Sequence, residues 1–362
     1  MQYINRIMLA LILFGTLPSA YAVEGESIVL DSRTGNYLIT HYSDLDRKFE
    51  TLIFIPATKI KPTIKCKHNL THEGIVRYEY NLISGRDSQQ VIVGILFDPV
   101  SSVTTPMPDI PLNAPPGKIM GDMQVAADYF ETPRLWHSMM SYSEGQNAFR
   151  IGWLIKVANG LAPGNQATFG FRSRDLPGII QARVDGYAPK SQKIDGEELP
   201  DAEDGGFGQQ YFALLMNNYL LRPVAAPTIA VPAPFDAAVL LDRIRTQVAT
   251  WPGKQLLDPA FATQLERNMV AAANAFRNNQ PKAGREHIES LRRLLDHEHK
   301  YLDHDDEDND DTPEHKAATR LTIDRLAAWV LDFDLRYVLK RIEKEHEHDH
   351  DEGDRRKEQE RK

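Results

Sequence analysis

The first half of the chain alternates apolar and polar positions with the period of a β-strand. Val76, Tyr78, Tyr80 and Leu82 are apolar or aromatic, and a polar residue stands between each pair. Such alternation is typical of a strand with one buried face. Short apolar runs predict further, buried strands in TLIFIPA, QQVIVGILF and FRIGWLIKVA. Glycine and proline separate these runs, so we expect an antiparallel β-sandwich over residues 23–208.

The pattern changes at a stretch rich in proline and alanine. Residues Arg222 to Phe235 read RPVAAPTIAVPAPF and contain four prolines. We expect this stretch to adopt an extended polyproline II conformation, as the main part of a linker over residues 209–235. It is the predicted boundary between two domains.

Beyond the linker, apolar residues recur with helical spacing. Leu240, Ile244 and Val248 step by four. Similar stripes follow at Leu265, Met269, Ala272 and Phe276, at Ile288, Leu291 and Leu295, and at Ile323, Leu326, Val330, Phe333 and Tyr337. Thr312 and Pro313 suit the N-cap and first turn of the last helix. We therefore predict a multi-domain β plus α protein, in which a small helical bundle over residues 236–345 follows the sandwich.

The N-terminal 22 residues have the pattern of a secretory signal peptide. Arg6 precedes the apolar run Ile7 to Phe14, and the small-x-small triplet Ala20-Tyr21-Ala22 follows. We expect cleavage before Val23 and export to the periplasm or out of the cell. An uncleaved anchor is the alternative, but this run is shorter than the roughly 18 residues that a spanning helix needs. No second stretch of that length occurs, so we expect no membrane span after cleavage.

Composition narrows the classes of partner. The net charge of −9 argues against binding to nucleic acid, since phosphates would be repelled. Cys66 is the single cysteine, so no disulfide forms within the chain. Lys65 and Lys67 flank this thiol and could make it reactive, although a bystander in a strand is the simpler interpretation.

An acidic insertion over residues 303–314 is the first candidate metal site. The segment DHDDEDNDDTPE holds eight carboxylates in twelve residues. Counted as an EF-hand loop, it places oxygen ligands at Asp303, Asp305, Glu307 and Glu314. Asp308 stands where that motif needs glycine. An ordered calcium loop, loose association of cations and a solvated insertion therefore remain open.

A second candidate metal site lies in the charged, histidine-rich tail over residues 346–362. His346, His348 and His350 alternate with carboxylates, a set of ligands that suits zinc. Alternate residues of a helix point about 200° apart, so chelation by all three would need an extended tail. A polar, frayed terminus is the alternative interpretation.

Other candidate residues have simpler explanations. His68 and His72, with Glu73 beside them, could bind a metal in a loop or could form ordinary hydrogen bonds. Aromatic residues of the predicted strands could stack on a sugar or could fill the core: Tyr78, Tyr80, Trp136 and Trp153.

Two segments resemble known modules of exported bacterial proteins. Residues 162–178, with a Pro-Gly turn at each end and Gly-Phe between them, resemble the closing strands of an Ig-like sandwich domain. Residues 257–295 resemble the helical module called the FIMAH domain, through Leu265, Ala272, Ala273, Asn278, Asn279, Ala283, Ile288 and Leu291. The chain departs from that module in the acidic insertion and in the longer last helix. The resemblance implies an accessory module and transfers no catalytic residue.

The sequence contains no nucleophile elbow, zinc-protease motif, P-loop or dinucleotide fingerprint. We therefore expect an exported binding or structural protein, whose sandwich recognises a protein or glycan surface. The alternative is a protein that buffers divalent metal through its C-terminal region, with calcium or zinc as the candidate cation. A divergent hydrolase is a third hypothesis.

Overall fold

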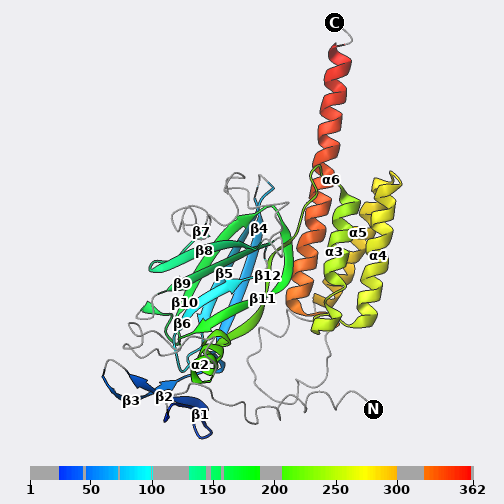
Figure 1. Ribbon diagram of the computed structural model, residues 1–362. Helices are drawn as coiled ribbons and strands as arrows, with labels where there is room; N and C mark the ends of the chain where they lie inside the picture. The colour runs from blue at the N-terminus through cyan, green and yellow to red at the C-terminus, as the bar shows by residue number, and fades with distance from the viewer. Residues whose placement is uncertain are drawn as a thin grey trace.

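The computed structural model describes residues 24–43, 46–71, 74–98, 100, 130–143, 148–155, 159–187, 206–299 and 322–359. These residues form three antiparallel sheets and five α-helices. The predicted combination of β and α structure is therefore confirmed. Helices α3 to α6 stand together beside the two larger sheets, whereas α2 lies by the smaller sheet (Figure 1).

The two larger sheets pack face to face through aromatic side chains. The first contains, in spatial order, β4 (Pro62–Leu70), β5 (Val76–Ser84), β10 (Gln166–Ser173) and β7 (Phe130–Glu131). The second contains β12 (Tyr219–Ile229), β11 (Leu176–Gly186), β6 (Ile92–Phe97), β9 (Ala148–Ile155) and β8 (Trp136–Ser143). Between them, the ring of Trp153 lies 5.1 Å from that of Phe169 and the ring of Phe97 lies 4.5 Å from that of Tyr80. The alternating pattern thus predicted the buried faces correctly.

A smaller sheet at the N-terminal end has its own core. It contains β1 (Ser27–Asp31), β2 (Asn36–Ser43) and β3 (Lys48–Phe54). Helix α2 (Phe207–Met216), which is distant in sequence, covers one face with Phe207 and Tyr211. The opposite face carries a row of partly exposed apolar residues, because the strand register aligns Val29, Leu38 and Ile53.

The prediction of a linker over residues 209–235, with its main part at Arg222 to Phe235, is wrong for residues 209–216 and 219–229. The first set belongs to α2, and the second forms β12, which pairs along its length with β11. Proline is tolerated there because β12 lies at the edge of its sheet, where one side of the strand needs no donor for a ladder. The alanines are buried rather than solvated, since Ala225 and Ala226 are 0% exposed.

Four helices follow β12 at the positions that the apolar stripes predict. They are α3 (Ala237–Val248), α4 (Pro259–Arg277), α5 (Pro281–His299) and α6 (Arg325–Gln359). The side chains of Asp236 and Asp258 accept hydrogen bonds from the first turns of α3 and α4. The apolar stripe placed Ile323 in the last helix. In the structure Ile323 precedes that helix and forms a β-bridge with Leu257. The predicted start at Thr312 and Pro313 lies outside the described residues.

The helices and the larger sheets share one hydrophobic core. Leu241 and Ile244 of α3, and Val330 and Leu331 of α6, belong to the same cluster of buried residues as the core of the two sheets. Gly178 of β11 allows a close approach, because a β-carbon there would lie 2.9 Å from Nε2 of Gln247 in α3. The helices therefore pack on the sheets directly rather than across a linker.

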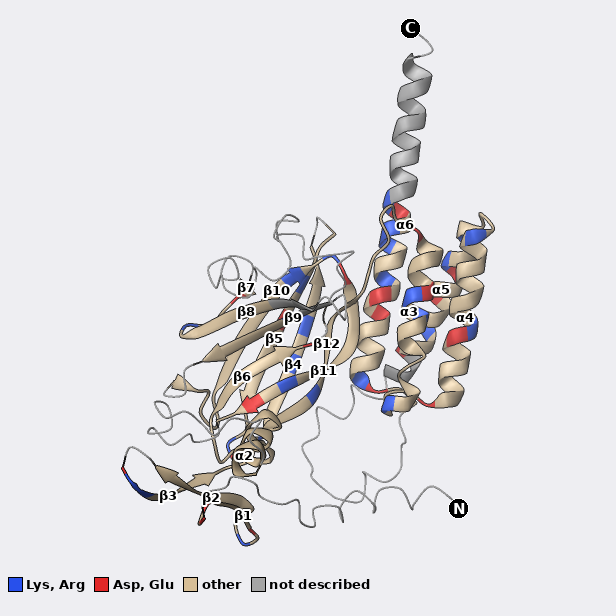
Figure 2. Cartoon of the chain, viewed as in Figure 1, with Lys and Arg blue, Asp and Glu red and all other residues tan. Residues whose placement is uncertain are grey.

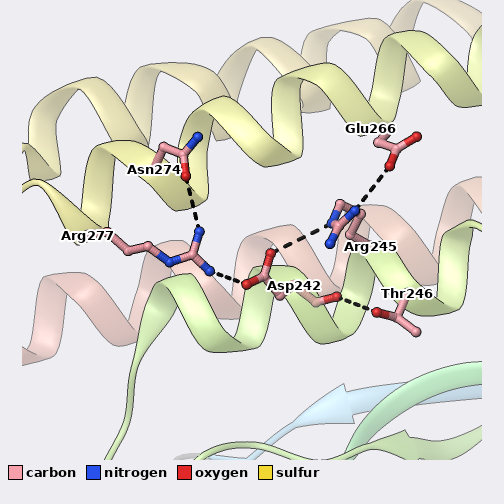
Figure 3. A network of polar contacts seen from close by, with 6 residues as sticks. All are labelled: Asp242, Arg245, Thr246, Glu266, Asn274 and Arg277. Atoms are coloured by element: carbon pink, nitrogen blue, oxygen red, sulfur yellow. Dashed lines mark hydrogen bonds and ion pairs between the residues drawn. The ribbon is translucent and has the colours of Figure 1, made fainter.

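A polar network joins α3 to α4 on the side exposed to solvent. Figure 3 shows the Asp242 carboxylate between the guanidinium groups of Arg245 and Arg277. Arg245 also contacts Glu266 at 3.1 Å, and Arg277 donates to the side-chain oxygen of Asn274 at 3.1 Å. Because these groups are half-buried or exposed, we expect the network to orient the helices more than to stabilise them.

Among the described helices, none is both long enough and apolar enough to cross a membrane. Charged residues of both signs instead occur along α6, the longest helix (Figure 2).

Candidate functional site

An open pocket lies between the end of β4 and one face of α6. Its volume is about 450 Å³, which is within the range of small-ligand sites. We call it the strand–helix pocket, and define it by its lining residues Lys67, His68, Asn69, Leu70, Trp329, Phe333, Arg336, Tyr337 and Lys340. It therefore combines a strand edge, three cationic side chains and three aromatic ones.

The strand wall of the pocket is a free sheet edge. β4 is the outermost strand of its sheet, and β5 is its only partner among the described strands. The backbone of Thr71 donates to Ile75 and that of Lys61 accepts from Gly85, so the odd-numbered residues of β4 bond to β5. In an antiparallel pair the alternate residues then direct their N–H and C=O groups away from the partner strand. His68 and Leu70 therefore present these backbone groups along the edge that lines the pocket.

The His68 side chain is buried without a hydrogen-bond partner. Its residue is 4% exposed, and neither ring nitrogen contacts a donor or acceptor among the described residues. The ring lies 3.8 Å from that of Trp329 and 4.3 Å from that of Phe333, measured between centroids. Burial, with a smaller effect of the Arg336 charge, lowers the pKa of His68 to about 3. The imidazole is therefore neutral near pH 7, with one donor and one acceptor unused.

The helix wall presents aromatic and cationic residues on one face. Trp329, Phe333 and Tyr337 are spaced by four, so they follow one another along α6. Arg336 pairs with Asp332 at 2.8 Å. Lys67 and Lys340 are exposed, and neither forms an ion pair with a residue in the described part of the chain. The two lysines thus supply most of the uncompensated charge of the pocket.

Lys67 faces one acidic neighbour across the sheet. Its partner in the strand register is Glu79, which itself forms an ion pair with Arg77 at 3.5 Å. Because Glu79 already has that cation, it leaves much of the lysine charge available to a ligand.

A second carboxyl group of α6, that of Asp334, offsets little of this charge. Asp334 is 1% exposed, and burial raises the pKa of its carboxyl well above the usual range. Its Oδ1 atom has no hydrogen-bond partner among the described residues. Because burial favours the neutral form of Asp334, the three cationic side chains of the lining outweigh it, and the pocket suits an anion that also has an apolar part.

The predicted metal sites cannot be assembled from the described residues. Asp303, Asp305, Glu307 and Glu314 lie outside them. His346, His348 and His350 lie in α6, which continues through the segment predicted as a tail. Alternate positions of that helix point about 200° apart, so the three-histidine site stays a prediction that requires α6 to unwind there. Within the described residues, no group of three His, Cys, Asp or Glu could hold a metal.

The other candidate residues that the structure describes are buried or half-buried. Tyr78, Tyr80, Trp136 and Trp153 are at most 7% exposed, so they fill the core and offer no sugar-stacking platform. Burial raises the pKa of the Cys66 thiol to about 12, which favours the bystander interpretation over a reactive thiolate. His72 and Glu73 lie outside the described residues, whereas His68 packs against α6.

The strand–helix pocket was missed in the sequence because its two walls are far apart in the chain. A partial signal was present, since Trp329, Phe333 and Tyr337 share a helix face with Arg336 and Lys340. Aromatic residues beside cations on one face are unusual for a helix that only fills a core. The stripe alone nevertheless did not indicate which strand would complete the pocket.

No protein-family model, curated protein or solved structure matches this chain. The functional argument therefore depends on the geometry of the pocket.

Proposed function

We propose that the protein is a binding protein and that the strand–helix pocket holds an anionic ligand with an apolar part. The observation that carries the proposal is the His68 imidazole, which lines the pocket while both of its ring nitrogens lack partners. An unpaired buried polar group costs about 1–3 kcal/mol. Neither ring nitrogen is exposed in the structure, so a ligand would bond to one of them, and recover part of that cost, by displacing the ring of Trp329 or Phe333.

The surrounding charges support an anion rather than a cation. Lys67 and Lys340 are uncompensated by other described residues, and Arg336 shares its charge with Asp332. The rings of Trp329 and Phe333 would contact the apolar part of the ligand. Aromatic area and cationic groups that converge on one concave site are the usual composition of a small-ligand pocket.

We also propose the architecture and the cellular compartment that the sequence led us to expect. The two larger sheets would form an Ig-like sandwich, and α3 to α6 would form a small helical bundle that serves as an accessory module. The N-terminal segment would direct export to the periplasm or out of the cell. Metal buffering through Asp303 to Glu314 and the three tail histidines remains the alternative, and dialysis against zinc and calcium tests it.

A second candidate function is recognition of a protein surface by the small sheet. The favouring observation is its apolar row, in which Val29 and Ile53 are each 54% exposed and Leu38 lies between them. Exposed apolar faces of this kind often mark interaction sites. Replacement of Val29 and Ile53 by threonine should abolish such an interaction without changing the strand–helix pocket.

The test of the pocket uses 3-phenylpropanoate as the probe and its neutral amide as the control. We expect the acid to bind more tightly than the amide, because only the acid can pair with Lys67 and Lys340. Lys67→Gln and Lys340→Gln should each weaken binding of the acid several-fold. Lys65→Gln and Lys344→Gln are matched controls on the same elements outside the pocket lining, and should have little effect. Equal binding by all four variants would place the ligand elsewhere.

A further inference from the structure

The free edge of β4 indicates the shape of the ligand as well as its charge. We infer that the ligand of the strand–helix pocket is an extended peptide segment that pairs with β4 and places a carboxylate beside Lys67 and Lys340. This inference rests on the proposed function and narrows it to one class of ligand.

The backbone groups of β4 repeat at the spacing of a second strand. His68 and Leu70 each direct an N–H and a C=O toward the pocket, and none of these groups has a backbone partner among the described residues. The two residues are two positions apart, which corresponds to roughly 6.8 Å along a strand. A small anion can bond to one such pair of groups, whereas only an extended chain can match both. Addition of a strand to a free sheet edge is an established mode of peptide recognition.

Two contacts cover other parts of the β4 edge. Near its start, the guanidinium of Arg222 donates to the carbonyl oxygen of Pro62 at 3.2 Å. In its middle, the Cys66 thiol reaches the carbonyl oxygen of Ala225 at 3.5 Å, which places β12 against this strand. An unpaired edge is a liability that proteins usually cover. The pocket lies at the uncovered end of this edge, where the cationic and aromatic side chains converge.

Each group of side chains in the pocket would contact a different part of such a peptide. A carboxylate near Lys67 and Lys340 would form charge-assisted hydrogen bonds. An apolar side chain of the peptide would contact Trp329 and Phe333. Displacement of one of these rings would let a peptide group bond to an unused nitrogen of His68, neither of which is exposed in the structure. The carboxylate could come from the C-terminus of the peptide or from an acidic side chain, and the test distinguishes these sources.

The experiment follows the amide resonances of His68 and Leu70 in protein labelled with ¹⁵N at histidine and leucine. The probe is a pool of acetylated pentapeptides that are degenerate among uncharged residues at four positions and end in phenylalanine with a free carboxylate. There are three comparison pools. The first has a C-terminal amide, and the second has a C-terminal amide and an internal glutamate. The third keeps the free carboxylate and carries N-methyl groups on alternate backbone nitrogens. 3-Phenylpropanoate is the non-peptide probe.

We expect the free-acid pool to shift both amide resonances and the N-methylated pool to bind at least tenfold more weakly. Loss of binding with the plain amide indicates that the ligand needs a carboxylate. Recovery of binding with the internal glutamate assigns that carboxylate to a side chain, and failure to recover assigns it to the C-terminus. Leu70→Pro removes an edge N–H that makes no bond to β5 and should weaken the peptide selectively, whereas Leu70→Val should not.

Two other outcomes separate this inference from the proposed function. Binding of 3-phenylpropanoate at the pocket without binding of any peptide pool would overturn the peptide inference and leave the proposed function intact. Equal affinity for the free-acid and N-methylated pools would also overturn strand pairing. Failure of both the peptides and 3-phenylpropanoate to bind would overturn the proposed function as well.

Discussion

The imidazole of His68 lies against the indole of Trp329, with 3.8 Å between the ring centroids. The contact joins the edge strand of one sheet to the last helix, so the pocket exists only when α6 is packed against β4. It also removes the imidazole from water without giving its nitrogens a partner among the described residues. This arrangement has consequences for stability as well as for binding.

Replacement of His68 by phenylalanine should reduce the loss of stability in acid. In the unfolded chain histidine takes up a proton near its ordinary pKa of 6.5, but in the folded protein the pKa of His68 is about 3. The unfolded state therefore binds more protons between these values, and folding stability falls as the pH falls through this window. The His68 contribution has a slope of up to about 1.4 kcal/mol per pH unit, and His68→Phe should lack it. Urea unfolding at several pH values measures the slope.

His137→Phe is the control, because His137 lies on an exposed position of β8. If His68→Phe and the wild-type protein lose stability in parallel between pH 6 and pH 4, the imidazole does not occupy a buried, unpaired position.

Replacement of Asp334 by asparagine should stabilise the protein increasingly as the pH rises. Burial raises the pKa of this carboxyl well above 3.8, so the folded state retains a proton that the unfolded state has lost. The contribution of Asp334 to the stability of the wild-type protein therefore falls as the pH rises above about 4, whereas Asp334→Asn has no proton to retain. The difference in free energy of unfolding between the two proteins should grow from pH 4 to pH 7. A difference that is constant across this range would contradict the account.

Replacement of Gly178 by alanine should destabilise the contact between β11 and α3. A β-carbon at Gly178 would overlap Oγ1 of Thr228 and would lie 2.9 Å from Nε2 of Gln247. Overpacking of this kind costs about 1–3 kcal/mol. Gly253→Ala, in the short 3₁₀ helix η5 (Pro252–Lys254), is a matched control because no atom lies within 4 Å of its built β-carbon. Similar melting temperatures for the two variants would show that α3 does not approach the sheet so closely.

The helices and the larger sheets should unfold together. β12 holds buried residues that belong to the same cluster as those of α3 and α6. We therefore expect one calorimetric transition, and we expect a fragment that ends at residue 235 to lack a cooperative transition, because it exposes the outer face of β11 and β12. A fragment that melts cooperatively would support the two separate domains that the sequence suggested.

The periodicity of apolar residues predicted the individual strands and helices well, but it did not predict how they pack together. The stripe from Leu240 to Val248 and the alternation from Val76 to Leu82 reflect local burial, which the sequence records directly. The stretch from Arg222 to Ile229 was misinterpreted because its prolines are typical of linkers, and their tolerance at a sheet edge depends on the finished topology. The pairing of α2 with the small sheet is equally non-local.

The candidate site was unpredictable for the same reason. His68 was noticed as a metal ligand beside His72, because sequence proximity was the available guide. Its neighbours in the fold are Trp329 and Phe333, which packing alone brings to β4.

The ring nitrogens of His68 offer the most direct test that this pocket binds an anionic ligand. In protein labelled with ¹⁵N at histidine, long-range ¹H–¹⁵N spectra should show a neutral His68 imidazole near pH 7. Addition of 3-phenylpropanoate should shift at least one of its nitrogen resonances as a hydrogen bond forms, and Lys67→Gln combined with Lys340→Gln should remove the shift. Resonances of His137 should stay unchanged. Saturation of the protein with the probe while the His68 nitrogens do not move would contradict the account.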